Sequence, residues 1–427
     1  MMQFLPLILM FVLFVLNVPV AYSLLISGMS YFIFINNDLP MDLMIQSVMS
    51  STTSYPMLAI PFFITAGVIM SYSGISEELM NMAEVLTGHM RGGLGQVNVL
   101  LSTFMGGISG SPIADCAFES KVLVPEMEKK GFSKGFAAAL TAASSVITPI
   151  IPPGICLILY ATTTNQSIGD MFLAGYVPGI LMCAALMITV YLISKKRNYV
   201  PSREKATLKE IGRQAVKSIW ALLMPFGIIL GMRAGIFTPT ECGAICVLYS
   251  LVIGIFVYRK LKIQYLPRIL MESVVNTATV MFIMCCAGLF TKYLNWEQIP
   301  ATVSSFLLGL TDNKYVFLII VNLLLLVMGM FFDANAALII FPPLLAPVAA
   351  ELGINLVHFG IIMCMNITIG GVTPPFGILM FTAANITKVK IGTFIREALP
   401  FLAALLIVLL LITFVPQLPM FFLNIWG

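Results

Sequence analysis

Long apolar runs separated by short polar segments make up most of this chain, and the longest runs have the length that crosses a bilayer. About 20 consecutive apolar residues form a membrane-spanning helix. Barrel strands would instead show short segments in which apolar and polar positions alternate. We therefore predict an all-α polytopic membrane protein, with apolar helices at 4–35, 52–72, 171–194, 218–232, 239–258, 265–290, 299–310 and 394–416.

One unusual segment occurs twice, and a proline pair interrupts both copies. The first copy covers 147–161 and the second covers 370–383. A shift of 222 residues places Pro152-Pro153 on Pro374-Pro375, whereas Asp115 meets Asp333 only if four residues are inserted in the second copy. Two prolines remove two N–H donors and end a helix. The pattern therefore predicts two broken helices, at 135–165 and 356–387.

Paired helix breaks in a membrane protein carry functional meaning. Irregular backbone at membrane depth is tolerated only where it packs on protein or lines a polar cavity. Corresponding breaks in two halves of a chain point to the substrate and ion site of a transporter. We therefore predict inverted repeats, each with a broken transmembrane helix preceded by a re-entrant helical hairpin.

Basic residues orient the segments, because lysine and arginine are concentrated in cytoplasmic loops. Segment 194–217 carries eight of them and is expected to be cytoplasmic. The span 171–194 ends in a basic cluster, whereas its partner 394–416 is preceded by Lys388 and Lys390 and has no basic residue after it. The charges swap ends, so the two repeats are expected to lie in opposite orientations.

The same comparison identifies the hairpins. Basic residues flank both ends of 94–125, so this hairpin is expected to enter from the cytoplasm, with its tip at 106–112. Its partner, 316–350, is expected to enter from the periplasm, with its tip near 329–335. Residues 76–90 are amphipathic and are expected to lie at the interface. Nine full crossings remain, with the N-terminus in the cytoplasm and the C-terminus in the periplasm.

Composition agrees with this pattern and excludes several function classes. The chain is 59% hydrophobic and 10% charged, with a mean hydropathy of +1.00. A soluble domain has about 25% charged residues. The sequence contains no HExxH, GxSxG or GxxxxGK[ST] motif, so we predict that it is not an enzyme and does not hydrolyse ATP. Energy would come from an ion gradient or from a separate subunit.

Polar side chains are few in the two halves and gather near the hairpin tips and helix breaks. There, carbonyl groups without helical partners can face a cation, and half-helix N-termini can face an anion. Hard oxygen ligands of this kind suit Na⁺. The side chains are Ser109, Ser111, Asp115, Ser144, Ser145, Thr148 and Asn165 in the first half, and Asp333, Asn335, Asn366, Thr368, Thr373 and Asn385 in the second.

The charged members of this set leave alternatives open. Asp115 and Asp333 could each cap a hairpin helix by accepting backbone N–H bonds, or could ligate a cation directly. Glu119 and Lys121 could form a local pair or a polar lining that attracts an anionic substrate. Elsewhere, the segment 238–241 predicts a capping box, with Thr238 as the cap and Glu241 closing the box.

With these motifs in order, the chain resembles the large membrane subunit of tripartite ATP-independent periplasmic (TRAP) transporters, of the DctM or SiaM type. The resemblance runs essentially from end to end. The motifs that carry it are GGISGSPIADCAFESKVLVPEMEKKGF (106–132), ITPIIPPGICLILYA (147–161), GIFTPTECGA (235–244), MGMFFDANAALIIFPPLLAPVAAELGI (328–354) and GGVTPPFGILMF (370–381).

The resemblance implies Na⁺-driven uptake of an organic acid, commonly a C4-dicarboxylate or a sialic acid, across the bacterial inner membrane by an elevator motion. It also implies two partners: a separate small four-helix membrane subunit and a soluble periplasmic substrate-binding protein. No nucleic-acid partner is expected. A stand-alone Na⁺/dicarboxylate carrier with similar inverted hairpins is the alternative.

The resemblance also implies domains and sites. Scaffold helices would occupy 1–75, 171–298 and 391–427, and transport-domain repeats would occupy 76–170 and 299–390. One Na⁺ site would involve Ser109, Gly110, Ser111, Asp115, Thr148 and Pro152. The other would involve Gly329, Asp333, Asn335, Gly370, Gly371 and Thr373. Candidate substrate contacts are Ser111, Lys121, Ser145, Asn165, Asn366 and Asn385.

Overall fold

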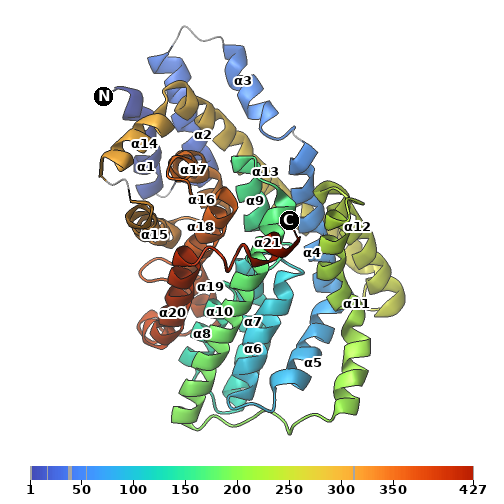
Figure 1. The fold of residues 1–427 in the computed structure, drawn as a ribbon. Coiled ribbons are helices and arrows are strands. Elements are labelled where there is room, and N and C mark those ends of the chain that lie inside the picture. The colour runs from blue at the N-terminus through green and yellow to red at the C-terminus, as the bar shows by residue number, and fades with distance from the viewer. Residues whose placement is uncertain (1, 17, 37–40, 54, 311–312, 427) are drawn as a thin grey trace.

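A computed structural model describes residues 2–16, 18–36, 41–53, 55–310 and 313–426 (Figure 1), and every regular element in those ranges is helical. The first ten α-helices are α1 (Leu5–Val15), α2 (Val20–Ser30), α3 (Met41–Ser50), α4 (Ala59–Ser73), α5 (Ile75–Thr87), α6 (Gly93–Gly106), α7 (Pro112–Lys129), α8 (Lys134–Ser144), α9 (Ile155–Thr164) and α10 (Ile168–Arg197).

The remaining α-helices follow the same all-helical pattern. They are α11 (Leu208–Arg233), α12 (Pro239–Val252), α13 (Leu266–Trp296), α14 (Ile299–Leu310), α15 (Lys314–Phe331), α16 (Ala334–Ile340), α17 (Pro342–Glu351), α18 (Leu356–Gly370), α19 (Ile378–Thr387), α20 (Ile391–Phe414) and α21 (Phe421–Trp426). Short 3₁₀ turns lie at Met2–Phe4, Tyr55–Leu58 and Ile263–Tyr265, and π turns lie at Tyr31–Ile35 and Ile253–Val257.

Both predicted helix breaks are present. The first separates α8 from α9, and the second separates α18 from α19. A side chain caps the start of each first half: Ser133 accepts a bond from the Phe136 N–H, and Asn355 accepts bonds from the Val357 and His358 N–H groups. The first helical residues, 134 and 356, are related by the 222-residue shift, so the repeat read from the prolines extends to the helix boundaries.

Helix packing repeats along with the sequence. In the first half α6 packs against α8, and in the second α15 packs against α18. Each half also contacts the other in matching ways: α7 packs against α19 and α16 against α9, while α8 packs against α20 and α18 against α10. Nearly all residues of α8 and all residues of α18 after Leu356 are buried, so the broken helices form the centre of the molecule.

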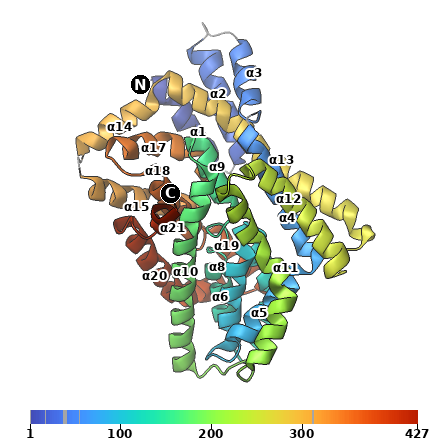
Figure 2. The same cartoon turned by 45° about the vertical axis from the view of Figure 1, so that its right-hand side comes forward.

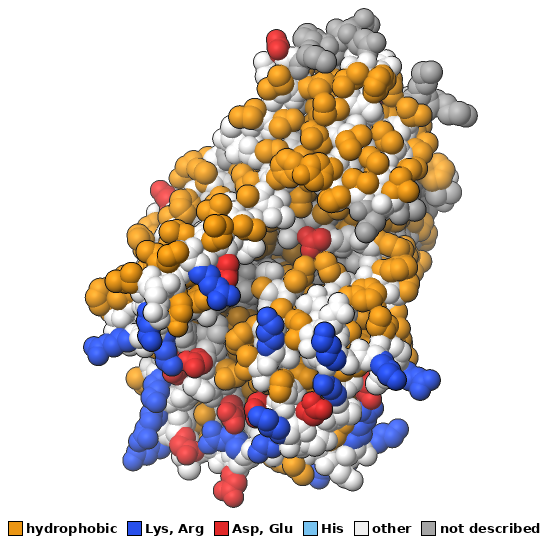
Figure 3. Space-filling model, turned by 180° about the vertical axis from the view of Figure 1, so that it is seen from behind, with side chains coloured by type: hydrophobic (Ala, Val, Ile, Leu, Met, Phe, Trp, Pro, Cys, Tyr) orange, Lys and Arg blue, Asp and Glu red, His pale blue; other side chains and the backbone are white. Residues whose placement is uncertain are grey.

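The remaining helices surround this centre. Figure 2 shows α4, α12 and α13 along one flank, and α4 contacts both of the others. Seven helices in the described ranges are long and apolar enough to cross a membrane, or eight if the bent pair α16–α17 counts as one. Lysine and arginine side chains gather at the lower end of the face shown in Figure 3, below a broad hydrophobic surface.

Several predicted boundaries were wrong. The run 4–35 is not one helix, because α1 ends at Val15 and α2 begins only after Pro19, which occupies its N-cap position. The second hairpin arm, 334–350, is bent by 54° between α16 and α17, where Pro342 and Pro343 follow Phe341. The charged segment 194–217 is mostly helical, because α10 continues to Arg197 and a capping box at Thr207 starts α11.

Candidate functional site

The first hairpin tip lies directly against the first helix break. Gly110, in the tip, has a positive φ of 56°, which favours glycine. A Cβ on Gly110 would lie 2.9 Å from the Pro153 carbonyl oxygen and 3.2 Å from the Ile155 nitrogen. The Pro152–Pro153 peptide is cis, as is Pro374–Pro375. Backbone from two distant segments therefore meets at the predicted position of the first site.

Asp115 is fully buried on α7 beside this junction. One of its oxygens, Oδ2, accepts a hydrogen bond of 2.8 Å from the Thr148 hydroxyl, whose oxygen also lies 3.2 Å from the Ser102 carbonyl oxygen. The other oxygen, Oδ1, is enclosed and has no hydrogen-bond partner among the described residues. The capping role is wrong for Asp115, because Ser111 is the N-cap of α7 and accepts from the Ala114 N–H.

Glu119, one helical turn beyond Asp115, binds neutral partners. Its oxygens accept hydrogen bonds from Asn98 Nδ2 at 2.7 Å and from the Ser102 hydroxyl at 3.0 Å. Asn98 also donates to the Thr141 hydroxyl. Lys121 is exposed and forms no ion pair with a described residue, so the suggested pairing of Glu119 with Lys121 is wrong. Glu119 instead ties the two arms of the hairpin together.

The second hairpin tip makes an equally close junction. A Cβ on Gly370 would lie 2.6 Å from the Gly329 Cα, so α15 and the end of α18 touch through their backbones. Asp333 does cap its hairpin helix, accepting a bond of 3.1 Å from the Asn335 N–H. Thr373 donates to the Ile369 carbonyl, 2.9 Å away, at the start of the second break.

The two carboxylates are therefore not structural counterparts. Without any insertion, the 222-residue shift places Ser111 on Asp333, and both residues are N-caps. The same shift places Asp115 on Ala337. The predicted alignment of Asp115 with Asp333 is therefore wrong. The equivalent positions in the two halves are the N-caps of α7 and α16, which are Ser111 and Asp333.

In each half, a buried asparagine of the hairpin accepts a hydrogen bond from a side chain of the broken helix. In the first, the Ser144 hydroxyl donates to Asn98 Oδ1 at 2.9 Å. In the second, Asn366, which the shift relates to Ser144, donates to Asn322 Oδ1 at 2.6 Å. Asn98 and Asn322 were missed from the sequence, although each is an amide within a largely apolar helix. An amide side chain in such a helix is the signal that could have identified them.

The candidate substrate contacts do not gather in one place. Ser145 donates to the Thr141 carbonyl at 2.7 Å and is fully buried, and Asn366 is occupied by Asn322. Asn165 ends α9 in a left-handed conformation and lines a cavity of about 460 Å³. Asn385 and Lys121 are exposed on α19 and α7. Among the candidates, the structure places Ser111 in the first hairpin tip and Ser145 near Asp115, away from the exposed Lys121 and Asn385.

Both junctions belong to one contiguous region. The Cys116 thiol on α7 lies 3.7 Å from the Leu379 carbonyl oxygen beyond the second break. The Cys364 thiol on α18 lies 3.6 Å from the Cys156 carbonyl oxygen beyond the first. With α16 also packed against α9, each hairpin contacts the broken helix of its own half and the second half-helix of the other repeat. The α4 helix also reaches the first tip, where a Cβ on Gly67 would lie 2.8 Å from the Ile108 carbonyl oxygen.

Solved structures share this fold. The chain aligns with the YdaH transporter of Alcanivorax borkumensis with a TM-score of 0.66 at 14% identity, covering 95% of this chain and 98% of that one. It aligns with MtrF of Neisseria gonorrhoeae with a TM-score of 0.62 at 15% identity, covering 96% and 94%. At these identities the likeness concerns the fold alone.

Relatives and a family model are far closer in sequence. The isethionate TRAP transporter permease protein DctMQ of Oleidesulfovibrio alaskensis is 37% identical over 408 residues, which are 96% of this chain and 64% of that protein. The sialic acid TRAP transporter large permease protein SiaM of Vibrio cholerae is 37% identical over 401 residues, 94% and 93%. Both are permeases rather than enzymes, in agreement with the prediction from missing motifs. The model described as "Tripartite ATP-independent periplasmic transporter, DctM component" matches residues 7–418. This chain is therefore a multi-pass membrane protein that belongs to the DctM component family of TRAP transporters.

Proposed function

We propose that this chain is the permease subunit for Na⁺-driven uptake of an organic acid across the inner membrane. The observation that carries the proposal is the enclosed Asp115 Oδ1, which has no hydrogen-bond partner among the described residues and lies beside a helix break. A buried carboxylate oxygen without a partner is unfavourable unless a cation or a proton satisfies it. Paired breaks in two related halves are the usual place for coupling ions in secondary transporters.

The residues of the first junction fit a hard cation. Asp115 Oδ1 supplies charge, Thr148 and Ser109 supply hydroxyl oxygens, and the 109–111 tip and the 148–152 segment supply carbonyls. Oxygen ligands of this kind suit Na⁺ as they suit other hard cations. We propose Ser109, Gly110, Ser111, Asp115, Thr148 and Pro152 as the residues of the first Na⁺ site.

The second junction differs, because its carboxylate already accepts a backbone bond. Asp333 would add charge from the helix start rather than from inside the helix. The close approach of Gly329 to Gly370 leaves room only for backbone groups at that point. We propose Gly329, Asp333, Asn335, Gly370, Gly371 and Thr373 as the second Na⁺ site, built mainly from carbonyl oxygens.

The substrate class follows from relatives of this chain. Their names specify isethionate, sialic acid and C4-dicarboxylates, each an organic anion with a sulfonate or carboxylate group. We propose that this chain carries an anion of that class and that hairpins and broken helices move together against the outer helices. A small four-helix subunit and a periplasmic binding protein are the proposed partners.

The proposed orientation places the 198–207 loop in the cytoplasm. The Tyr293 hydroxyl donates to the Gln3 carbonyl at 2.6 Å, so the N-terminus lies at the end of α13 that is remote from the basic segment 259–262. With α1 and α2 as separate helices, we therefore revise the expected N-terminus from the cytoplasmic to the periplasmic side.

The test is uptake by the purified chain reconstituted into liposomes with a small subunit and a binding protein from the same genome. We expect accumulation of labelled organic acid only with an inward Na⁺ gradient, and no dependence on ATP. Uptake by this chain alone, with free substrate, would favour a stand-alone carrier. Uptake that is indifferent to Na⁺ would contradict the proposed coupling.

A further inference from the structure

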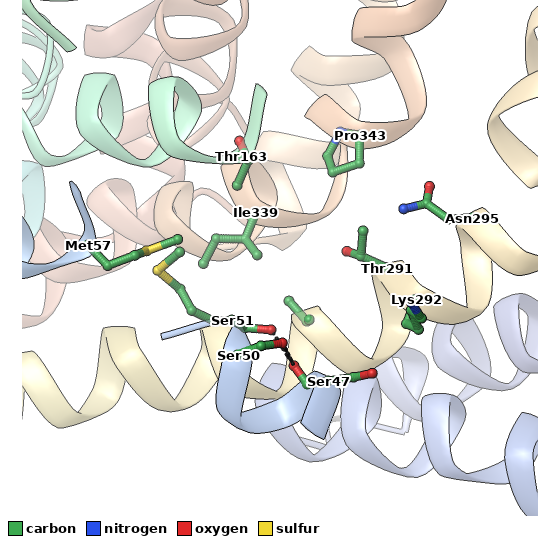
Figure 4. A pocket seen from close by; sticks show the side chains of 13 residues that line it. Ser47, Ser50, Ser51, Met57, Thr163, Thr291, Lys292, Asn295, Ile339 and Pro343 are labelled. Atoms are coloured by element: carbon green, nitrogen blue, oxygen red, sulfur yellow. Dashed lines mark hydrogen bonds between the residues drawn. The ribbon is translucent and has the colours of Figure 1, made fainter. Parts of the chain in front are cut away.

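A cavity of about 280 Å³ opens between helices that belong to different parts of the molecule (Figure 4). One wall is formed by α13 together with α3. The other is formed by Thr163 at the end of α9 and by Ile339 and Pro343 at the bend between α16 and α17. The predicted scaffold thus forms one side of the cavity, and elements of both predicted transport repeats form the other.

The α13 wall follows one face of a helix. Its lining residues are spaced at helical intervals, and they change character along the helix: Met284, Ala287 and Gly288 are followed by Thr291, Lys292 and Asn295. Residues three and four apart share a face of a helix. The cavity therefore has an apolar inner part and a polar outer part on the same surface.

Lys292 is the only charged residue among the described residues that line the cavity. Lys292 forms no ion pair with a described residue. The side chains of Thr291 and Asn295 form no hydrogen bond with a described residue either. The nearest acidic residue in the sequence, Glu297 just after α13, accepts a bond of 2.6 Å from the Tyr31 hydroxyl. Three side-chain donors, one of them cationic, are thus free to bind a ligand.

The serines opposite these donors do not compete for them. The hydroxyls of Ser47 and Ser51 donate to carbonyl groups of their own helix at 2.6 Å. The α3 helix also packs tightly here, since a Cβ on Gly288 would overlap the Ser51 side chain. The serine wall is therefore held in place beside α13.

We propose that this cavity binds a small organic anion through Lys292, Thr291 and Asn295, with the carbon skeleton of the anion against Met284, Ala287 and Ile339. A cation with flanking neutral donors suits a carboxylate or sulfonate group. The volume of about 280 Å³ lies just below the roughly 300–1,000 Å³ that is usual for small-molecule sites. Resting on the proposed function, the cavity is a waiting site where the transported acid binds before it reaches the tip–break junctions.

The first experiment measures access to the cavity without requiring transport. Cysteine is placed at Asn295 in the full chain, in nanodiscs of phosphatidylcholine, and its labelling by an anionic and a neutral thiol reagent of similar size is compared. Native cysteines provide little background, because seven are buried and Cys285 is half-buried. We expect the anionic reagent to react several-fold faster than the neutral one. Succinate or isethionate should slow the reaction of the anionic reagent. Lys292→Gln should abolish both effects.

The second experiment measures uptake. Lys292→Gln should raise the substrate concentration for half-maximal uptake about tenfold, as expected for loss of a charge-assisted hydrogen bond, with the maximal rate changed by less than about twofold. Lys292→Arg should restore most of the affinity. Lys314→Gln, on α15, is the matched control and should leave uptake unchanged.

The outcomes separate this inference from the proposed function. Na⁺-driven uptake together with unchanged affinity in Lys292→Gln and no protection by organic acids would overturn the waiting site alone. Protection without any uptake would overturn the proposed function and retain the site. Protection by anionic phospholipid in the nanodisc, but not by soluble acid, would show that Lys292 binds a lipid headgroup and would overturn the inference.

Discussion

Two buried carboxylates of the first hairpin, Asp115 and Glu119, stand one helical turn apart and face different partners. Both oxygens of Glu119 accept hydrogen bonds, from Asn98 and Ser102. In the part of the chain that the structure describes, only one oxygen of Asp115 does so. This difference assigns Glu119 to holding the hairpin together and leaves Asp115 for a ligand.

For Asp115, the expected result concerns Na⁺ affinity. Asp115→Asn keeps the size of the side chain and the bond to Thr148 but removes the charge. We expect the Na⁺ concentration for half-maximal uptake to rise about tenfold or more, while the melting temperature changes little. Measuring uptake against Na⁺ concentration checks this. An unchanged Na⁺ requirement would mean that the ion binds elsewhere.

Asp333 is expected to stabilise the protein by capping α16, and this cap does not require its charge. Asparagine caps helices as well as aspartate does, so Asp333→Asn should retain the cap, whereas Asp333→Ala should lose about 0.5–2 kcal/mol. Thermal unfolding of the two purified variants measures the difference. Equal melting temperatures for both would contradict the capping role that the Asn335 N–H contact supports.

Glu119 offers a comparison with its exposed neighbour Lys121. Glu119→Leu would leave the Asn98 amide and the Ser102 hydroxyl without their acceptor, at about 1–3 kcal/mol for each buried unsatisfied group. Lys121→Leu lies on the exposed side of the same helix and should be nearly neutral. We expect a clear fall in melting temperature for the first variant only. Similar values for both would contradict the assigned role of Glu119.

The sequence identified the right neighbourhood for these residues but not their partners. The basic residues that flank the first hairpin and the proline pairs of the two breaks indicated where the tips and breaks lie. The roles of Asp115 and Glu119 depend on hydrogen bonds with Asn98, Ser102 and Thr148 that join residues 17 or more positions apart in the chain. Only packing of α6, α7 and the first break brings these groups together.

At the scale of elements, close backbone contact between a hairpin tip and a broken helix occurs in both halves. Gly110 approaches Pro153, and Gly329 approaches Gly370. In both places a hairpin tip meets a broken helix without intervening side chains. Carbonyl groups of two segments can then face the same point, which side-chain packing would prevent.

Adding one methyl group at Gly370 tests this close backbone contact. A Cβ on Gly370 would lie 2.6 Å from backbone, so Gly370→Ala should separate α15 from α18, at about 1–3 kcal/mol for an overpacked site. Gly392→Ala is the matched control, because Gly392 is helical with open space around it. Uptake and melting temperature should fall for the first variant and hold for the second. A fully active Gly370→Ala variant would contradict a contact between these backbones.

Element boundaries were less predictable than element existence. Proline pairs marked both helix breaks, since no residue replaces the lost N–H donors. The bend between α16 and α17 follows the same chemistry, yet Pro342 and Pro343 lie within an apolar run that hydrophobicity alone reads as continuous. The helix α3 was not predicted, because its polar residues, such as Asp42 and Gln46, interrupt the apolar pattern.

For the whole molecule, the matched contacts of α7 with α19 and α16 with α9 mean that neither repeat forms the central region alone. The 222-residue repeat and the two breaks were visible in the sequence. This exchange of partners was not, because no local pattern specifies which half-helix a hairpin will meet. The two junctions are therefore linked by direct packing.

Opposite orientation of the two repeats is the last prediction, and single cysteines at the hairpin ends test it. Lys130, after α7, and Lys314, at the start of α15, are both exposed. If the two repeats lie in opposite orientations, a cysteine at Lys130 should react with an impermeant reagent only from the cytoplasm, and one at the basic position Lys314 only from the periplasm. A cysteine at Gln3 should follow Lys314, because Gln3 contacts Tyr293 at the far end of α13. Inside-out and right-side-out vesicles provide the two directions, and the unmodified chain provides the background. Labelling of positions 130 and 314 from the same side would rule out hairpins that enter from opposite faces, and labelling of position 3 with position 130 would restore a cytoplasmic N-terminus.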